Sequence, residues 1–371
     1  GQRKNPFYLQ RLRRHLAALV GQMPQLRRVE QPGGNRGRVG QRWQKPPGHA
    51  PRLRRAGQRP ITHGAQQQAP STCHRTLAAT QAGCHFTGTH ALETDVLILH
   101  QPLDDSQSDA IENYARHLPR VRRILTIDDL LTELPRKHPS YKQGYKDGRQ
   151  RLRKNLSLLH RAVVSTRPLA DLCAEMIDDV RIMPNCLEWA VWGDAQPPRL
   201  PRHKPRVGWA GAQQHLGDLE LIYPVVEALA DEVDWIFMGM CPDELRPYVK
   251  EFHRFVSYKE YPAKLASLDL DIAIAPLEDN PFNACKSNLR LLEYGACGFP
   301  VVCTDALPYR CDLPVTRVKN RYKDWVDAIR MHTNDLDATA AAGDALRAAV
   351  LKDWMLEGEH LEHWLKAWLP D

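Results

Sequence analysis

The sequence predicts an α/β protein with two parallel-sheet domains, and three observations support this fold class. Short apolar runs alternate with amphipathic segments over residues 93–190, and again over residues 206–345. Residues 191–205 between them carry four prolines and scattered charges, which is typical of a linker. Residues 272–303 follow the order strand, loop, helix, turn, strand, which is one βαβ unit.

The first block predicts about four parallel strands with helices between them. The predicted strands are Asp95–His100, Arg123–Ile127, Ala162–Thr166 and Arg181–Asn185. The predicted helices are Ser106–His117, Leu152–His160 and Pro168–Ile177. Ligand groups in such sheets lie at the carboxyl ends of the strands, and four polar residues fall there: His100, Asp128, Asp129 and Thr166. For each of them taken singly, a role as a turn or cap residue is the favoured explanation.

The second block repeats this alternation. Its predicted strands are Arg206–Gly211, Val233–Met238, Ile272–Pro276 and Val301–Cys303. Helices are predicted at Asp218–Leu229 and Tyr261–Ser267, and beyond the sheet at Trp325–His332, Ala340–Leu356 and His360–Leu369. We therefore place the second domain at 206–345 and C-terminal helices at 346–371.

Residues 1–92 differ chemically from the rest of the chain. They hold fourteen Arg and two Lys against one acid, Glu30, so their net charge is +15. The whole chain is +7, which leaves −8 for the remainder. The segment lacks sustained apolar periodicity and cannot bury enough surface to offset chain entropy. It stands where the first half of an N-terminal domain is expected.

Three interpretations fit residues 1–92: a disordered segment, a basic arm for nucleic acid or an anionic surface, and a stretch read in the wrong frame. Few aromatic residues are interleaved with the basic ones, which disfavours a base-stacking platform. We favour disorder or the frame error and expect no nucleic-acid partner. The chain begins with Gly1 rather than Met, which also fits a fragment of a longer protein.

Composition excludes several classes of protein. The chain has 371 residues, and no apolar run approaches the roughly 20 residues of a membrane-spanning helix. Its nine cysteines show no CxxC pair, which disfavours a disulfide framework or a zinc site. These features predict a cytoplasmic protein without a metal site.

The stretch Pro281–Cys303 carries the clearest candidate site. Asn283 and Ser287 are good helix caps, so we expect a helix to begin near Lys286. Free N–H groups at a helix start, with Lys286 beside them, form a place to hold a phosphate. Arg290 and Glu293 would follow on the same face. On helix chemistry alone, a surface helix in which Arg290 pairs with Glu293 explains the same residues.

The run LLEYGACGFPVV resembles the nucleotide-binding segment of family-4-like glycosyltransferases of the GT-B fold. Glu293 matches the second glutamate of that family's signature, which holds the donor ribose. The first glutamate would fall on Cys285, where this sequence departs from the pattern. Asn283, Lys286 and Ser287 match the Asn-x-x-Lys-Ser loop of a subgroup. The resemblance covers roughly residues 94–371 and is strongest over 206–308.

The segment GWAGAQQHLGD resembles the first phosphate loop of the same family. Gly208 and Gly211 would let the backbone approach a diphosphate. Many relatives carry an Arg and a Lys after that glycine, where this chain has Ala212 and, roughly, His215. Lys286 and Arg290 would then supply the missing positive charge. A tight turn explains the two glycines equally well.

The resemblance implies a GT-B enzyme: two Rossmann-like domains that face a cleft, with the N-terminal one incomplete. Such an enzyme moves a sugar from a nucleotide-diphosphate donor to a glycan or lipid-linked acceptor, with retention, in cell-envelope polysaccharide or lipopolysaccharide synthesis. It implies Lys286 as a catalytic residue, no cofactor, and peripheral contact with the inner membrane face. Asp128, the second catalytic candidate, falls where some relatives carry a His after a Thr-containing strand, and it would touch the acceptor or the donor sugar. A sugar-nucleotide epimerase of the same fold and a non-catalytic nucleotide-sugar-binding remnant stay open as alternatives.

Overall fold

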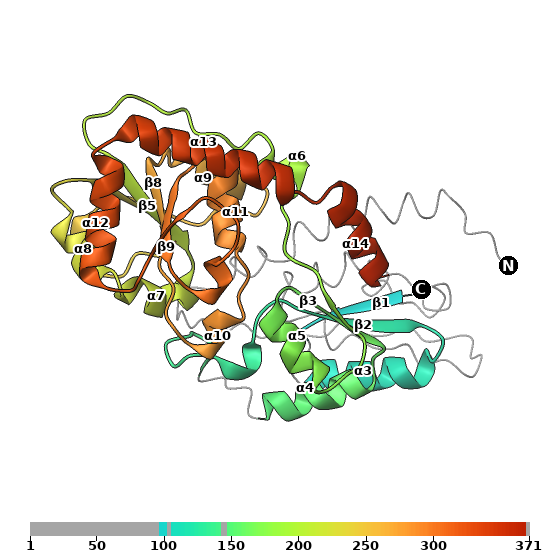
Figure 1. Cartoon of the computed structure of the whole chain (residues 1–371). Helices are drawn as coiled ribbons and strands as arrows, with labels where there is room; N and C mark the ends of the chain where they lie inside the picture. Colours follow the sequence, from blue (N-terminus) through green and yellow to red (C-terminus); the bar gives the residue numbers. More distant parts are fainter. Residues whose placement is uncertain (1–95, 102–104, 142–146, 369–371) are drawn as a thin grey trace, which may run out of the picture.

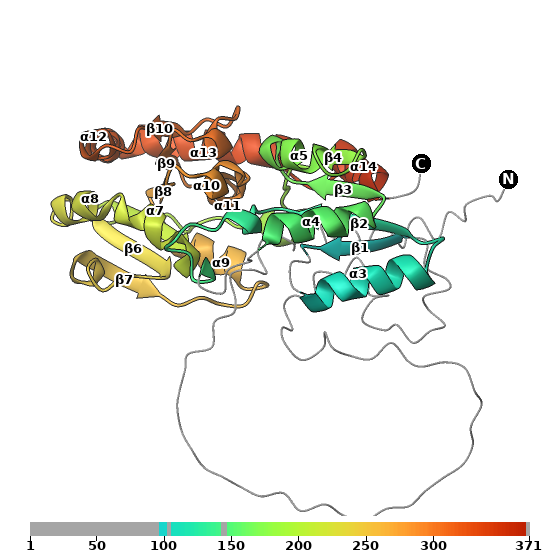
Figure 2. The ribbon, with the colours of Figure 1, turned by 90° about the horizontal axis from the view of Figure 1, so that it is seen from below.

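The structure, a computed structural model, describes residues 96–101, 105–141 and 147–368. These residues form two α/β halves that lie side by side (Figures 1 and 2). The interpretation of residues 1–92 falls outside the described residues. Within them, none of the helices combines the length and apolarity that crossing a bilayer requires.

The N-terminal half is built on a parallel sheet whose four strands keep the order of the chain, β1-β2-β3-β4. Its strands are β1 (Val96–His100), β2 (Arg122–Ile127), β3 (Arg161–Val164) and β4 (Val180–Ile182). The connections contain α3 (Asp105–His117), the 3-10 turn η3 (Leu131–Glu133), α4 (Gly148–Ser157) and α5 (Arg167–Ala174). Leu97 and Leu99 pack into the core on these helices, and Ile98 faces the other side.

The C-terminal half is built on a six-stranded sheet with the order β10-β9-β8-β5-β6-β7, and all of its pairs are parallel. Its strands are β5 (Arg206–Gly211), β6 (Asp234–Gly239), β7 (Val249–His253), β8 (Ile272–Ala275), β9 (Val301–Thr304) and β10 (Thr316–Val318). β5 pairs with β6 on one side and with β8 on the other. The order of strands therefore reverses between β5 and β8.

Helices cover both faces of this second sheet. They are α7 (Leu216–Glu220), α8 (Tyr223–Ala228), α9 (Tyr261–Ser267), α10 (Pro281–Ala284), α11 (Leu289–Ala296), α12 (Tyr322–Thr333) and α13 (Leu336–Asp353). The 3-10 turns are η5 (Gln213–His215), η6 (Arg246–Tyr248) and η7 (Leu307–Tyr309), and α6 (Trp189–Trp192) precedes the linker. Trp209 and Ala210 are neighbours in β5 but belong to different core clusters, as the two-residue period of a strand requires.

The last helix, α14 (Gly358–Trp368), returns to the N-terminal half. Trp364 and Trp368 pack in one cluster with Ile98 and Ile124 of the first sheet. The buried Arg161 guanidinium donates to the carbonyl oxygen of Ala367 at 2.8 Å. The C-terminal helix therefore packs on the first sheet (Figure 1).

The predicted helix start near Lys286 is wrong. Asn280 caps the short α10 by accepting a hydrogen bond from the N–H of Asn283, and Pro281 follows at the first helical position. That helix ends at Ala284, and α11 begins at Leu289. Lys286 therefore lies in the turn between two helices, and it does not share a helical face with Arg290 and Glu293.

The helix predicted over 218–229 is two helices, α7 and α8. Pro224 lies in the first turn of α8, where its missing N–H is not needed, and a continuous helix would have required that donor.

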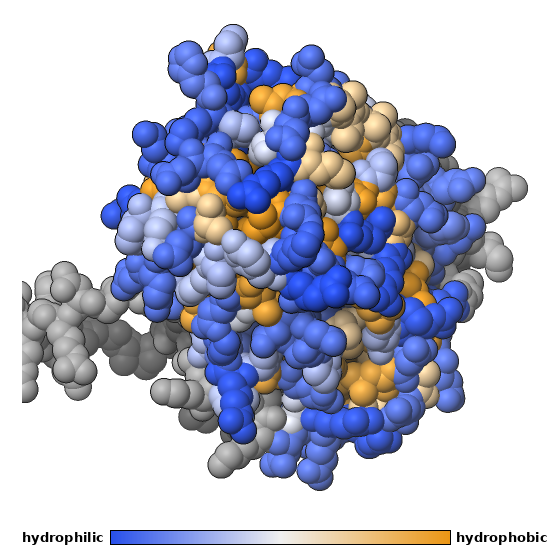
Figure 3. Space-filling view, turned by 60° about the vertical axis from the view of Figure 1, so that its left-hand side comes forward, coloured by the Kyte–Doolittle hydropathy of each residue, from blue (hydrophilic) through white to orange (hydrophobic). Residues whose placement is uncertain are grey.

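The outer face of the C-terminal half is mostly hydrophilic, with apolar groups in separate small areas (Figure 3).

Candidate functional site

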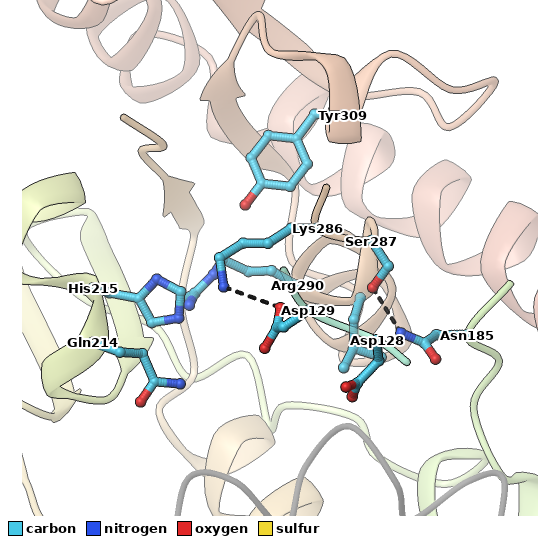
Figure 4. A pocket seen from close by; sticks show the side chains of 10 residues that line it. Asp128, Asp129, Asn185, Gln214, His215, Lys286, Ser287, Arg290 and Tyr309 are labelled. Atoms are coloured by element: carbon cyan, nitrogen blue, oxygen red, sulfur yellow. Dashed lines mark hydrogen bonds and ion pairs between the residues drawn. The ribbon is translucent and has the colours of Figure 1, made fainter. Parts of the chain in front are cut away.

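The candidate site lies at the reversal of strand order between β5 and β8. The loops that leave these two strands separate there and leave a crevice at the carboxyl edge of the sheet. A pocket occupies this place and also touches the N-terminal half (Figure 4). Its lining residues are Asp128, Asp129, Asn185, Gln214, His215, Lys286, Ser287, Leu289, Arg290 and Tyr309.

The turn after β5 brings His215 to the pocket. η5 follows Gly211 and Ala212 directly and continues into α7, so His215 stands at the start of α7. Its Nδ1 lies 2.7 Å from Oδ2 of Asp218, three residues further on. The imidazole also meets the Trp209 indole edge to face, with 6.4 Å between ring centroids. Both contacts fix the orientation of the buried ring.

Asp218 is buried and joins the turn after β5 to the loop after β8. Its Oδ1 accepts hydrogen bonds from the N–H of Glu278 at 2.7 Å and from the side-chain amide of Asn283 at 2.9 Å. Burial raises the pKa of the Asp218 carboxyl, while the Glu278 N–H, the charges of Lys286 and Arg290 and the Asn283 amide act against that rise. The carboxylate thus holds both sides of the crevice.

Lys286 reaches the pocket from the turn before α11. Its Nζ lies 3.6 Å from Oδ1 of Asp129, which follows β2 in the N-terminal half. The same ammonium stands 4.3 Å from the centroid of the Phe282 ring. Both partners of the ion pair are largely buried, with side chains 15% and 16% exposed. The ion pair therefore bridges the two halves across the site (Figure 4).

Arg290 enters the pocket from the first turn of α11. Its guanidinium donates to the carbonyl oxygen of Ala210 in β5 and lies 5.5 Å from the Trp209 ring. Every residue of α11 is buried, so the interpretation of this segment as a surface helix is wrong. The mostly apolar helix packs between the sheet and α13. Its charged residues, Arg290 and Glu293, are therefore buried together with its apolar ones.

Glu293 is buried and is not among the residues that line the pocket. Its Oε2 accepts a hydrogen bond from the Tyr261 hydroxyl at 3.2 Å. Glu293 is only 1% exposed, and its expected place on one charged face with Lys286 and Arg290 is therefore wrong. The prediction failed because α11 is covered on all sides, so that each of its eight residues is buried.

The two glycines of the β5 segment are needed for packing. A Cβ at Gly208 would lie 2.5 Å from the Leu270 side chain, and one at Gly211 would lie 2.4 Å from the Trp209 indole. Gly208 stands in the middle of β5, and neither glycine lines the pocket. Their predicted role in letting a diphosphate approach receives no support from this geometry.

The loop between α10 and α11 is tied to the N-terminal half. Ser287 Oγ accepts a hydrogen bond from Asn185 Nδ2 at 2.8 Å, and the carbonyl oxygen of Cys285 accepts one from Thr166 at 2.9 Å. Phe282 and Cys285 belong to the core cluster of that half. Asn283 does not line the pocket, and its side-chain amide instead donates a hydrogen bond to Asp218.

Asp128 lies in the pocket next to Asp129, at the carboxyl end of β2. Its Oδ1 accepts a hydrogen bond from Gln101 Nε2 at 2.6 Å and lies 3.7 Å from His100 Nε2. The predicted gathering of polar groups at the ends of β1 and β2 is confirmed. Gln101 has φ of 42°, a left-handed backbone that is strained for this residue.

Sequence reasoning missed four lining residues: Asn185, Gln214, Leu289 and Tyr309. Asn185 follows the fourth strand, a position that itself indicated a ligand group. Tyr309 lies in η7, which no periodicity marks, and burial raises the pKa of its hydroxyl. Among the described residues, no three His, Cys, Asp or Glu side chains gather as a metal site would require.

Comparison with known proteins gives matches by structure. No protein-family profile matches the chain, and no curated protein matches its sequence. The structure is similar to sucrose-phosphate synthase from Thermosynechococcus elongatus, with TM-score 0.56, 15% identity, and coverage of 78% of this chain and 76% of that one. It is also similar to Anabaena HepE in complex with UDP, with TM-score 0.52, 13% identity, and coverage of 75% and 78%.

A third similar structure is TarM, with TM-score 0.52 and 15% identity. The match covers 73% of this chain, which spans about half of TarM, 54% of its length. The fold of this chain is the GT-B fold of glycosyltransferases.

Proposed function

We propose that this chain is a glycosyltransferase that moves a sugar from a nucleotide-diphosphate donor to an acceptor. One observation carries the proposal: the pocket gathers His215, Lys286 and Arg290 from the C-terminal half and places carboxylates of the other half opposite them. A diphosphate is the strongly anionic part of such a donor, and cationic side chains at the crevice of an α/β sheet suit it. The fold supports the same assignment.

The proposed chemistry rests on charge. Transfer breaks the bond between the anomeric carbon and the diphosphate oxygen and joins that carbon to a hydroxyl oxygen of the acceptor. Negative charge grows on the departing diphosphate, which takes up the hydroxyl proton. Lys286 meets that charge, together with the N–H groups at the start of α11, without a metal or organic cofactor. Asp128 contacts the acceptor or the sugar that moves. Ser287 and Asn283 hold the loop that carries Lys286.

Glu293 is the proposed ribose ligand, but its carboxylate first has to leave the Tyr261 hydroxyl. Because that hydrogen bond has to break, the ribose contact should contribute less to the free energy of donor binding than the phosphate contacts do. The resemblance of residues 291–302 to family-4-like enzymes supports retention of the anomeric configuration. The same resemblance supports a lipid-linked or glycan acceptor at the cytoplasmic face of the membrane, in cell-envelope polysaccharide or lipopolysaccharide synthesis.

Titration calorimetry of the full chain with UDP, GDP and ADP tests the donor site. UDP comes first, because the similar HepE structure contains it. We expect one nucleotide to bind and its binding to weaken in Lys286→Ala. If none of the three binds, the proposal fails.

Product analysis then separates three functions. NMR of a UDP-sugar incubated with the chain and with sugar acceptors shows a new glycoside for a transferase, and the anomeric coupling constant reports retention or inversion. A sugar-nucleotide epimerase would give a changed sugar without any acceptor, and Asp128 and Asp129 in the pocket are the observation that favours it. Binding without any product indicates a non-catalytic remnant.

A further inference from the structure

We propose that the side chain of Tyr309 is a further ligand of the donor and that its hydroxyl donates a hydrogen bond to the diphosphate. This inference rests on the proposed function and adds to its site a residue from η7. Tyr309 is only 3% exposed, yet it lines the pocket. Its hydroxyl is directed into the pocket, toward Lys286 and Arg290 (Figure 4).

The fold holds Tyr309 in this place through its backbone and its ring. β9 ends at Thr304, and η7 follows it at the carboxyl edge of the sheet. The N–H of Tyr309 donates to the carbonyl oxygen of Ala306 at 2.9 Å, and its own carbonyl oxygen accepts from Nε of Arg317 at 2.7 Å. The ring belongs to the same core cluster as Leu289. None of these contacts uses the hydroxyl.

The hydroxyl of Tyr309 has no partner within the described part of the chain. The two side chains there that hydrogen-bond to Tyr309, those of Arg317 and Cys311, both do so at its backbone carbonyl oxygen. Tyr294, in the same core cluster, shows the usual arrangement, since its hydroxyl accepts from the N–H of Ala210 at 2.8 Å. Buried polar groups are normally hydrogen-bonded, and one that is not costs free energy. A ligand in the pocket would supply the missing partner.

The surroundings of the hydroxyl favour an anionic partner. A tyrosine hydroxyl ordinarily titrates at about 10, and burial raises the pKa of Tyr309 further, although the charge of Arg290 acts against this rise. The phenol therefore keeps its proton at neutral pH and can donate it. Lys286 and Arg290 beside it also carry only donors. Phosphate oxygens accept from several donors at once and gain most from charged ones.

Tyr309→Phe is the direct test, because it removes one oxygen and keeps the ring that packs in the core. Titration calorimetry of the full chain with UDP, GDP and ADP measures binding, and melts of the chain without nucleotide measure stability. Tyr322→Phe is the control for binding, since Tyr322 is exposed on α12 and does not line the pocket. Tyr294→Phe is the control for stability, because it removes a hydroxyl that does have a partner in the protein.

We expect Tyr309→Phe to weaken binding of the nucleoside diphosphate by about ten- to a hundredfold, the range for a hydrogen bond to a charged group. Tyr322→Phe should bind as the wild type does. Without nucleotide, Tyr309→Phe should melt at the wild-type temperature or above it, whereas Tyr294→Phe should melt lower. Normal binding by Tyr309→Phe overturns the inference. A melting temperature lowered as in Tyr294→Phe also overturns it, because the hydroxyl would then serve the fold.

Two further probes locate the contact along the donor. A hydroxyl that binds the diphosphate lowers the affinity for UDP and for UDP-glucose by the same factor, and it leaves competition by uridine unchanged. A loss confined to UDP-glucose would place the hydroxyl at the sugar, and an equal loss for uridine would place it at the base or ribose. Either result contradicts the inference. If the wild type binds no nucleotide, the proposed function fails; if Lys286→Ala weakens binding and Tyr309→Phe does not, only the inference fails.

Discussion

Replacing Asp129 by Asn should strengthen nucleotide binding. The Asp129 carboxylate lies 3.6 Å from Lys286 Nζ, on the side of the ammonium that the proposed diphosphate needs. Donor binding therefore has to weaken an existing ion pair and also bring anionic oxygens near a carboxylate. Asparagine keeps the size of the side chain and removes its charge.

The magnitude follows from the geometry. Two unit charges 3.6 Å apart attract by about 5 kcal/mol at an effective dielectric constant of about 20. Desolvation of both largely buried groups offsets most of this attraction. A net gain of about 1–2 kcal/mol remains for a ligand that no longer competes with Asp129, which corresponds to about five- to thirtyfold tighter binding.

Titration calorimetry with the nucleotide that binds best measures this effect. Asp128→Asn is the matched control, because it removes a neighbouring carboxylate whose Oδ1 accepts from Gln101. In a Lys286→Ala background, Asp129→Asn should change the affinity much less. Unchanged or weaker binding by Asp129→Asn, with Lys286 in place, would refute the idea that Asp129 occupies the phosphate subsite.

Four further predictions concern single residues. Lys286→Ala should weaken nucleotide binding and lower kcat, with a total loss of about 1–3 kcal/mol in binding and activation free energy, because the lysine meets charge that grows in the transition state. An unchanged kcat contradicts this. Glu293→Gln should lower the melting temperature as well as nucleotide affinity, because Glu293 is buried against Tyr261, and an unchanged melt argues for an exposed side chain. Trp368→Ala should cost about 3–5 kcal/mol in denaturant unfolding, since it opens a cavity between α14 and the first sheet, and a loss under 1 kcal/mol contradicts that packing. The Arg206 guanidinium lowers the pKa of Glu251 to about 2, so this pair stabilises the fold above the ordinary glutamate range and loses that effect as the pH falls toward 2. Acid melts of Arg206→Gln should show a smaller loss of stability over this range than wild type, and parallel curves refute the linkage.

Apolar periodicity predicted the four inner strands of the second sheet and missed the two at its ends, β7 and β10. The prediction at Arg206–Gly211 matches β5 residue for residue. β7 and β10 were missed because both lie at the ends of the sheet order, where side chains are polar and half-buried. An edge strand needs no apolar run, so its sequence resembles a loop.

The pocket was predicted where its residues follow strands or carry charge beside the motif. Asp128, His215, Lys286, Ser287 and Arg290 all line it. The complete burial of α11 was not predictable from amphipathic spacing. The spacing of Leu289 and Leu292 identifies one packing face and does not show whether other elements cover the opposite face. Partners such as Asp218 and Asn283 also depend on tertiary folding, because 65 residues separate them.

The loop of residues 280–288 links the proposed donor site to the N-terminal half. Phe282 and Cys285 are part of the core cluster of that half, although α10 follows a strand of the other sheet. The hydrogen bonds from Thr166 and Asn185 hold the backbone and the hydroxyl on either side of Lys286. The position of Lys286 is therefore set by packing against the sheet of the N-terminal half as much as by the sheet of the C-terminal half, to which Lys286 belongs. It follows that changes in the core of the N-terminal half should reach the diphosphate subsite through this loop, without any contact between that core and the donor.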